Sequence, residues 1–355
     1  MWCALTKKSC LLNVVSRGHE RKLSMNDKIF KVAIVGAGYM AREHVRAFKD
    51  MPNVKLVGIH SRTRSRAEIL AVEFGIDGVF DSIEDLYAAT KADLVVVTVV
   101  EVSMNGVSKA CFKFPWAVLL EKPPGMNVQD AADILSSANA EKRLVMVAVN
   151  RRCYASTRAA LASVRQIEGP RYIRVCDQQD QAAALAAGQP EIVVNNWMYA
   201  NSIHTIDYLR LFGRGKVKNV NRIIPWNPEN PWVVLAEVEF ESGDIGVYEG
   251  IWKGPGPWAV TICTHDKRWE MRPLEQATVQ LAGQRQLMAV DSHSWDNDFK
   301  PGLRLQAELV VTAALGGARE VPTLAESLET MYLIEAIFQV DNDSKRGISE
   351  SNGSF

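Results

Sequence analysis

Residues 31–44 read KVAIVGAGYMAREH, an apolar run that enters two glycines and continues as a possible helix. Gly36, Gly38 and Ala41 form the pattern G-x-G-x-x-A directly after the apolar run. The first small residue permits a tight turn, the second lets the backbone approach a pyrophosphate, and the third lets the helix pack against the sheet. The stretch therefore predicts a dinucleotide-binding turn, although two glycines can also simply turn a corner.

Apolar runs alternate with helical patterns from about residue 30 to residue 150. The runs are KVAIVG, VKLVGIH, LVVVTVV, WAVLLEK and LVMVAVN, and segments such as SRAEILAVEFG lie between them. Strands that are apolar throughout and separated by helices imply a parallel sheet covered on both faces. Residues 29–150 are therefore predicted to form an α/β domain with a Rossmann-type, doubly wound parallel sheet.

The pattern of predicted helices and strands changes after residue 150. Helix-like stretches give way to strand after strand, including a hairpin centred on Ser242-Gly243-Asp244, and two helices follow near the end of the chain. Residues 151–340 are predicted to form a C-terminal α+β domain with a large, open-faced, mostly antiparallel sheet. Residues 1–28 are predicted to be a poorly ordered extension, with Met25 as an alternative start, and residues 341–355 a polar tail.

Charge and cysteine content exclude several classes of function. The 355 residues contain 41 basic and 41 acidic side chains, which argues against a nucleic-acid or anionic-membrane surface because both need concentrated positive charge. No apolar run approaches the roughly 20 residues that cross a bilayer. The cysteines are scattered without zinc spacing, so we expect reduced thiols in a cytoplasmic protein, no metal and a small-molecule partner. They are Cys3, Cys10, Cys111, Cys153, Cys176 and Cys263.

The end of the second apolar run bears on the choice of dinucleotide. It reads His60-Ser61-Arg62, with no carboxylate to bond the ribose hydroxyls and repel a 2′-phosphate. Ser61 and Arg62 can instead hold such a phosphate. NADP(H) is therefore favoured, and NAD(H) is the alternative. Arg62 can also simply be a solvated residue at the start of a helix, without a role in binding.

Two segments supply candidate acid–base groups. Glu121-Lys122-Pro123-Pro124 follows a strand at the carboxyl edge of the sheet, where such folds bind ligands. Burial and the positive nicotinamide ring of a bound dinucleotide would lower the pKa of Lys122 from its reference value of about 10.4. Alternatively, the lysine only ends the strand, and the prolines after it prevent the strand from continuing. His204 is expected in the first turn of a helix capped by Asn201 or Ser202, and a histidine there can act as general base or simply pack.

Together these motifs resemble one family over about residues 30–340. VAIVGAGYMAREH, EKPPG, NRRCY, IHTIDYLRLFG and PGLRLQAE are similar to the Gfo/Idh/MocA family of NAD(P)-dependent sugar and polyol oxidoreductases. The resemblance implies a Rossmann domain, an open-faced C-terminal sheet and a substrate pocket between them. It implies that Lys122 is the catalytic lysine and His204 the active-site histidine, and that Asn150, Arg151, Arg152 and Tyr154 cross between the domains near the pocket.

The sequence also departs from the family pattern. Ala200 stands where sugar-oxidising members often carry an aspartate, four residues before the histidine. The run from Thr98 to Asn105 replaces a turn of Pro-Asn type. These changes keep a second interpretation open, a non-catalytic NAD(P)-binding regulator of the same fold.

The expected function is hydride transfer between a nicotinamide dinucleotide and a secondary alcohol or ketone of a sugar, cyclitol or sugar derivative. Lys122 and His204 form the expected acid–base pair, and either can be the base. The partly apolar open face predicts a homodimer or homotetramer. Among the tryptophans, Trp197 and Trp252 are the candidates for the pocket. The expected cofactor contacts are Gly36, Gly38, Tyr39, Met40, Ser61, Arg62, Thr98, Glu121 and Lys122. The expected substrate contacts are Lys122, Asn150, Arg152, Tyr154, Asn201, His204 and Asp207.

Overall fold

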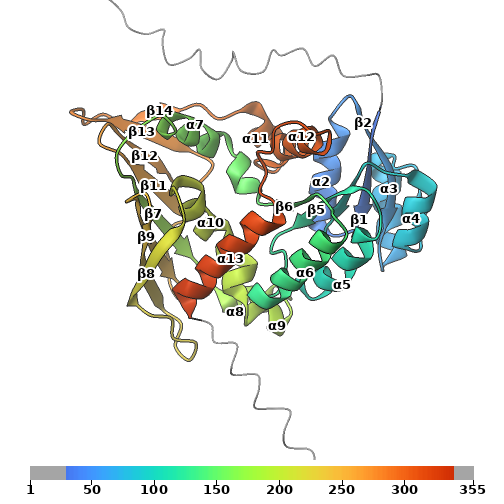
Figure 1. The fold of residues 1–355 in the computed structure, drawn as a ribbon, viewed down its shortest axis with the longest axis horizontal. Helices are drawn as coiled ribbons and strands as arrows, with labels where there is room; N and C mark the ends of the chain where they lie inside the picture. The colour runs from blue at the N-terminus through green and yellow to red at the C-terminus, as the bar shows by residue number, and fades with distance from the viewer. Residues whose placement is uncertain (1–28, 340–355) are drawn as a thin grey trace, which may run out of the picture.

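The structure is a computed structural model that describes residues 29–339. The predicted extension 1–28 and the polar tail 341–355 lie outside the described residues. The chain forms a parallel sheet and a larger, mostly antiparallel sheet, with helices between them (Figure 1). Both predicted sheets are therefore confirmed.

The first sheet has six parallel strands in the order β3-β2-β1-β4-β5-β6. Strands β4 and β6 are buried along their whole length, which explains why they read as continuous apolar runs. The two-residue strand β3 was not predicted, since so short a run carries no periodic signal. The strands are β1 (Phe30–Val35), β2 (Val54–His60), β3 (Val79–Phe80), β4 (Leu94–Val97), β5 (Ala117–Glu121) and β6 (Val145–Ala148).

Helices connect these strands, and polar side chains begin two of them. The Ser82 side chain accepts a hydrogen bond from Asp85 N, and the Asn127 side chain accepts one from Asp130 N, so each satisfies an N–H at a helix start. The helix after β1 has no such cap. The helices are α2 (Tyr39–Lys49), α3 (Arg64–Phe74), α4 (Ile83–Thr90), α5 (Glu101–Phe112) and α6 (Val128–Ala140).

The second sheet has eight strands in the order β14-β13-β12-β11-β7-β10-β9-β8. All neighbours are antiparallel except β7 and β10. The predicted hairpin joins β9 to β10, with Gly243 at φ 84° in its turn. The strands are β7 (Tyr172–Gln178), β8 (Val217–Ile224), β9 (Val233–Phe240), β10 (Ile245–Ile251), β11 (Ala259–Cys263), β12 (Lys267–Met271), β13 (Ala277–Leu281) and β14 (Met288–Val290).

Helices pack on one face of this sheet and leave the other open. Side chains of β9 and β10 alternate between buried and half-buried, as expected when only one face is covered. Figure 1 shows α7, α10 and α13 on the covered side of the sheet. The helices of this part are α7 (Ala155–Val164), α8 (Gln181–Ala186), α9 (Glu191–Val194), α10 (Ile203–Phe212), α11 (Ser294–Asp298), α12 (Leu303–Ala314) and α13 (Leu324–Phe338).

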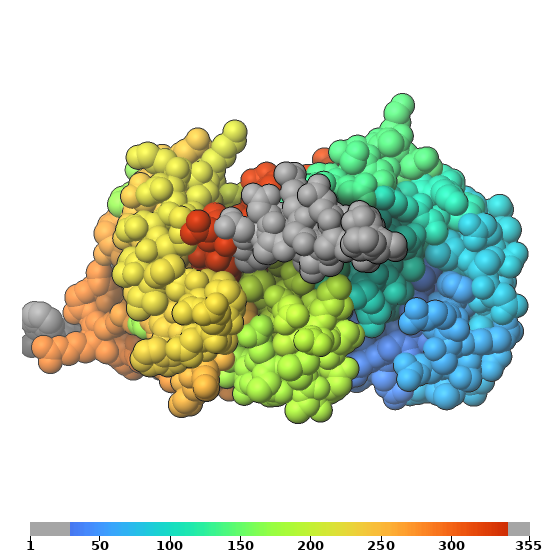
Figure 2. Space-filling view, turned by 90° about the horizontal axis from the view of Figure 1, so that it is seen from below, coloured from blue at the N-terminus to red at the C-terminus, as the bar shows by residue number. Residues whose placement is uncertain are grey.

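Late segments of the chain return to the parallel sheet. Helix α12 packs against α2, and Leu303 and Ala307 share one apolar core with Val45 and Phe48. Helix α13 begins at a capping box of Thr323 and Glu326 and contacts both α6 and α10. Figure 2 shows the yellow-green segment that carries α8 and α9 between the two parts. These contacts fix the carboxyl edge of the parallel sheet opposite α10.

Two features are absent from the part of the chain that the structure describes. No helix within residues 29–339 is long and apolar enough to span a membrane. The same residues contain no group of three or more histidine, cysteine or acidic side chains placed to hold a metal ion.

Candidate active site

The glycine turn after β1 has the geometry that a dinucleotide needs. Gly36 has φ 108°, and a Cβ there would lie 2.5 Å from Thr98 Oγ1, so a larger residue is excluded. At Gly38 a Cβ would meet nothing within 4 Å. Gly38 also precedes α2 without a side-chain cap, which leaves N–H groups of the first helical turn for an outside acceptor. The open space and the uncapped helix start fit a pyrophosphate.

Side chains from both parts of the chain surround this turn. Tyr39 is 65% exposed at the start of α2, and Met40 beside it is half-buried. Lys300 Nζ, from the loop before α12, lies 5.3 Å from the centre of the Tyr39 ring. Sequence analysis missed Lys300, because a single lysine in a loop carries no signal of what it faces.

The end of β2 lies next to the glycine turn. Gly36 N donates to His60 O at 2.8 Å, so the two residues that follow His60 lie near the same edge. Ser61 Oγ accepts a hydrogen bond from Thr63 N, and the Arg62 side chain is exposed. Arg64 by contrast pairs with Glu68 on α3 at 2.9 Å. The exposed guanidinium of Arg62 can thus meet a ligand at this edge.

Lys122 follows β5 and links the two parts of the chain. Its Nζ donates to Ala200 O at 2.9 Å. Burial lowers the pKa of Lys122 below its ordinary value, and the positive charges of Arg151 and Lys300 act in the same direction against Glu121. The structure therefore has a half-buried amine directly after β5, at the carboxyl edge of the parallel sheet.

Glu121, an expected cofactor contact, has both carboxylate oxygens bonded within the protein. Its Oε1 lies 2.7 Å from His44 Nε2 on α2, and both side chains are buried. Its Oε2 accepts a hydrogen bond from Lys122 N at 3.1 Å. The pair ties the end of β5 to the helix of the glycine turn, and His44 was not recognised from the sequence.

The helix that carries His204 begins earlier than the sequence suggested. Met198–Ser202 form a π-helical turn that continues directly into α10. Ser202 has helical dihedral angles and makes no side-chain cap, while the Asn201 amide donates to Gln179 Oε1 at 2.7 Å. The predicted N-cap is therefore wrong, because the chain is already helical before these residues.

His204 lies buried next to several positive charges. It is 8% exposed, and its Nδ1 has no hydrogen-bond partner within residues 29–339. Burial lowers the pKa of His204 well below 6.5, and the charges of Arg151, Lys122 and Lys300 lower it further. The imidazole is therefore neutral at neutral pH and can accept a proton.

Asn150 and Tyr154, two expected substrate contacts, hold the loop before α12. Asn150 Nδ2 donates to Pro301 O at 3.0 Å. Tyr154 is buried, and a Cβ at Gly302 would lie 3.0 Å from its ring and 2.2 Å from Asn150 O. Gly302 has φ 77°, so the close approach explains the glycine. These contacts hold the two side chains against the loop before α12.

Arg152 and Asp207, also expected at the substrate, bind each other. Arg152 Nε and Nη2 donate to the two oxygens of Asp207 at 2.6 Å each. Thr330 Oγ1 on α13 donates to the same carboxylate at 3.0 Å. Because the Asp207 oxygens already accept three hydrogen bonds, we interpret the pair as the buried joint between the crossing segment, α10 and α13.

A polar network lies beneath α10. Gln179 Oε1 accepts hydrogen bonds from Trp197 Nε1 at 2.9 Å and from the Asn201 amide. Gln179 Nε2 donates to Asp177 Oδ1 at 2.7 Å, and the Tyr248 hydroxyl donates to Asp177 Oδ2 at 2.8 Å. Burial raises the pKa of Asp177 above its ordinary value. The network fixes the start of the helix that presents His204.

The second tryptophan named as a pocket candidate lies in the core. Trp252 is 3% exposed, and its ring centre lies 4.4 Å from that of Trp226 and 5.3 Å from that of Phe338. A different tryptophan lies beside the candidate acid–base groups. The Trp258 ring centre is 6.3 Å from that of His204 and 4.4 Å from Arg151 Cζ.

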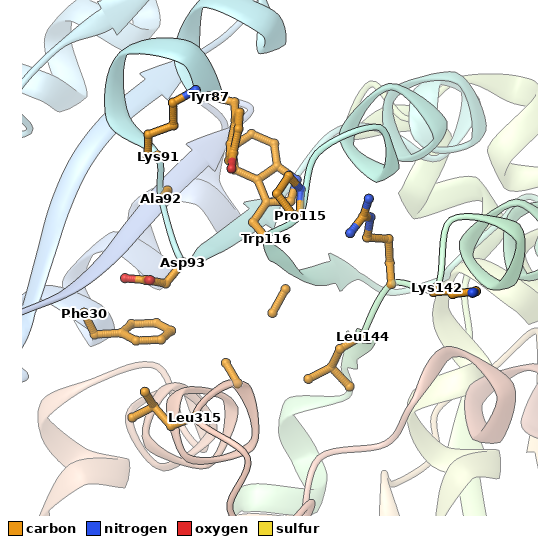
Figure 3. Close-up of a pocket in the computed structure, with 13 residues that line it drawn as sticks. Phe30, Tyr87, Lys91, Ala92, Asp93, Pro115, Trp116, Lys142, Leu144 and Leu315 are labelled. Carbon is orange, nitrogen blue, oxygen red and sulfur yellow. The ribbon is translucent and has the colours of Figure 1, made fainter.

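A cavity of about 470 Å³ opens at the other edge of the parallel sheet. Figure 3 shows Phe30, Asp93 and Trp116 around it, and Lys91 beside the ring of Tyr87. These lining residues come from the amino ends of the strands, whereas the glycine turn and Lys122 lie at the carboxyl ends. The cavity is thus separate from the candidate active site.

Comparisons with known proteins agree with this geometry. Residues 30–149 match a family described as "Oxidoreductase family, NAD-binding Rossmann fold". The D-apiose dehydrogenase of Paraburkholderia graminis is 24% identical over 191 residues, which cover 52% of this chain and 50% of that protein. The chain therefore spans about half the length of this relative.

Solved structures share the whole fold. A dehydrogenase from Chromobacterium violaceum has a TM-score of 0.77 at 18% identity, covering 90% of this chain and 97% of that one. A levoglucosan dehydrogenase in complex with NADH has a TM-score of 0.73 at 16% identity, covering 87% and 95%. At these identities the likeness establishes the arrangement of both sheets.

Proposed function

Because residues 30–149 match the family model of Gfo/Idh/MocA oxidoreductases, we propose that the chain is an NAD(P)-dependent dehydrogenase or reductase. It acts on a secondary alcohol or ketone of a sugar, cyclitol or sugar derivative. One observation carries the proposal: the Lys122 amine bonds to Ala200 O, four positions before His204, and its charge acts on the His204 imidazole from a separate part of the chain. Named relatives such as D-apiose dehydrogenase support the sugar class.

The glycine turn is the proposed cofactor site. Gly38 and the uncapped start of α2 would hold the pyrophosphate, and Ser61 with Arg62 would lie at the adenosine end. When bound, the nicotinamide ring supplies the hydride donor or acceptor. The same proposal includes pairing of copies through the open face of the eight-stranded sheet, as a homodimer or homotetramer.

The acid–base roles follow from burial and charge. His204 is neutral at neutral pH, so in the oxidative direction its imidazole accepts the proton of the substrate hydroxyl. In its protonated form the Lys122 amine donates hydrogen bonds, one of which already goes to Ala200 O, and another can polarise the substrate oxygen. In the reductive direction the same two groups return the proton. We therefore assign His204 as the base and Lys122 as the polarising group.

The pH dependence of oxidation tests the role of His204. Because the pKa of His204 lies well below 6.5, the imidazole stays neutral as the pH falls through 6.5, and kcat/KM should decline only at more acidic pH. The measurement is a kcat/KM profile in the oxidative direction, compared with that of His204→Asn. The variant should lose that acidic limb together with most of its activity. An acidic limb with its midpoint above 6.5 would contradict the assignment.

The preference for NADP(H) depends on Arg62. Replacing Arg62 with alanine should raise the KM for NADP(H) about tenfold or more, with a smaller effect on NAD(H), because a charge-assisted bond to the 2′-phosphate is lost. Arg66→Ala, which removes another exposed arginine of the same segment, serves as the control. Equal changes for both cofactors would show that Arg62 does not hold the phosphate.

The proposed function itself is tested by nicotinamide fluorescence. The purified chain is mixed with NADP(H) or NAD(H) and a panel of aldoses, polyols, cyclitols and their oxidised derivatives. Reduction or oxidation of the cofactor with at least one member supports a dehydrogenase. Cofactor binding without turnover across the panel would favour a regulator that only senses the dinucleotide.

A further inference from the structure

Arg151 presents a buried guanidinium nitrogen that the protein leaves without a partner. Nη1 is buried and has no hydrogen-bond partner within residues 29–339. The guanidinium carbon lies 4.4 Å from the centre of the Trp258 ring, and Trp258 is held in turn by a 2.6 Å bond from its Nε1 to Gln178 O. The Tyr208 hydroxyl donates to Arg151 O at 3.3 Å. Side chain and backbone are thus held in place.

The neighbouring arginine, by contrast, has a carboxylate partner. Arg152 is paired with Asp207 through two hydrogen bonds of 2.6 Å. A charged donor that is buried and unpaired costs free energy, and native structures rarely retain one without a functional reason. The adjacent position on the same segment has no such carboxylate, so its partner is expected to come from outside the protein.

The charges around His204 point in the same direction. Arg151, Lys122 and Lys300 are the charges that act on the imidazole, and all three are positive. Of the carboxylates near these cations, Glu121 bonds to His44, and Asp177 bonds to Gln179 and Tyr248, while Glu275 acts on Arg151 and Glu101 on Lys122 through charge alone. The whole chain carries equal numbers of basic and acidic residues. The charges that act on His204 are therefore all positive, although the chain as a whole is balanced.

We propose that the substrate carries a carboxylate group, which Arg151 binds against the Trp258 ring while His204 faces the carbinol. The substrate is then a sugar acid or a related hydroxy acid rather than a neutral sugar. This inference rests on the proposed function, since it names the substrate class of the same pocket. Trp258 and His204 have ring centres 6.3 Å apart, so one small molecule can contact Arg151 and His204 together.

A carboxylate fits this pocket better than a phosphate ester does. The planar guanidinium fork matches the two oxygens of a carboxylate, and stacking on an aromatic ring keeps its edge free for them. Phosphate sites in proteins usually add backbone N–H groups of a helix start. Here a π-helical turn, Met198–Ser202, leads directly into α10, so the start of α10 is not a free helix N-terminus.

Matched substrates that differ only in charge test the inference. The pairs are D-glucose with D-glucuronate and D-galactose with D-galacturonate, and D-glucose 6-phosphate is added as the phosphate arm. We expect kcat/KM to be about 10² or more higher for the uronate in at least one pair, because a polar site rejects the analogue that lacks its partner. Equal or higher kcat/KM for the neutral sugar in both pairs would overturn the inference, as would a preference for the phosphate ester.

Variants of Arg151 assign the preference to this side chain. Arg151→Gln should lower kcat/KM for the uronate about 10²-fold and change that for the neutral sugar by only about threefold. Arg151→Lys, which keeps the charge without the planar fork, should fall between Arg151→Gln and the unmodified protein. Arg165→Gln removes an exposed arginine just beyond α7 and should change neither substrate. Equal losses on both substrates in Arg151→Gln would indicate a merely structural role and overturn the assignment.

A binding measurement without cofactor separates this inference from the proposed function. D-Glucuronate should quench the tryptophan fluorescence of the protein and raise its melting temperature, while D-glucose at the same concentration and ionic strength should not. Arg151→Gln should abolish the difference. Turnover of neutral sugars without uronate binding would leave the proposed function standing and overturn this inference. Uronate binding without turnover of any sugar or sugar acid would support this inference and contradict the proposed function.

Discussion

Replacing Lys122 with methionine should lower turnover by about 10²- to 10⁴-fold, the usual cost of losing a positioned proton-transfer group. The half-buried amine bonds to Ala200 O at 2.9 Å, so the variant removes the only part of the side chain that can polarise a substrate oxygen while keeping its length. The measurement is kcat with the best substrate of the panel, at saturating cofactor.

A control and a binding assay make this result specific. Lys113→Met removes an exposed lysine just beyond α5 and should leave turnover unchanged. Cofactor affinity, measured by nicotinamide fluorescence, should change little in Lys122→Met, because Gly38 and the start of α2 are the proposed pyrophosphate contacts. Turnover near that of the unmodified protein would remove Lys122 from the mechanism.

Replacing Asp207 with alanine should destabilise the fold by about 3 to 5 kcal/mol, the typical cost of breaking a buried ion pair from one side. Arg152 would keep its buried charge and lose both 2.6 Å bonds, and Thr330 would lose its acceptor. The measurement is the midpoint of denaturant or thermal unfolding, followed separately by tryptophan fluorescence and circular dichroism.

Two further variants separate burial from charge. Glu68→Gln breaks the exposed pair with Arg64 and should change stability by no more than about 0.5 kcal/mol. The double variant Arg152→Met with Asp207→Leu should recover much of the loss, because apolar replacement of both partners of a buried pair is often neutral or stabilising. An Asp207→Ala protein as stable as the unmodified one would contradict the interpretation of this pair as a structural joint.

The sheets were predictable from the sequence because their signals are local. A strand buried on both faces must be apolar at every position, and β4 and β6 show this directly. A half-covered sheet alternates, as β9 and β10 do. Short elements such as β3 and α9 were not predicted, because two to four residues are too few to show a hydrophobic periodicity.

The candidate site was predictable only in part. Lys122 follows a strand end and a proline turn, and His204 lies in a helix, so both stand in local patterns that the sequence displays. The partners of other polar residues lie far along the chain: Arg152 meets Asp207 across 55 positions and His44 meets Glu121 across 77. The family resemblance gave Arg152 to the substrate, and the position one helical turn after His204 gave Asp207, whereas the structure shows the two side chains bonded to each other.

By itself, therefore, the sequence determined the order of the elements, the glycine turn and the positions of Lys122 and His204, since each depends on neighbours within a few residues. Tertiary structure alone decided which charges are neutralised and which stay open, because hydrogen bonding and burial depend on segments that meet in space. Asp207 is bonded to Arg152, and Glu121 is bonded to His44. Arg151 packs against Trp258, and its Nη1 has no hydrogen-bond partner within residues 29–339.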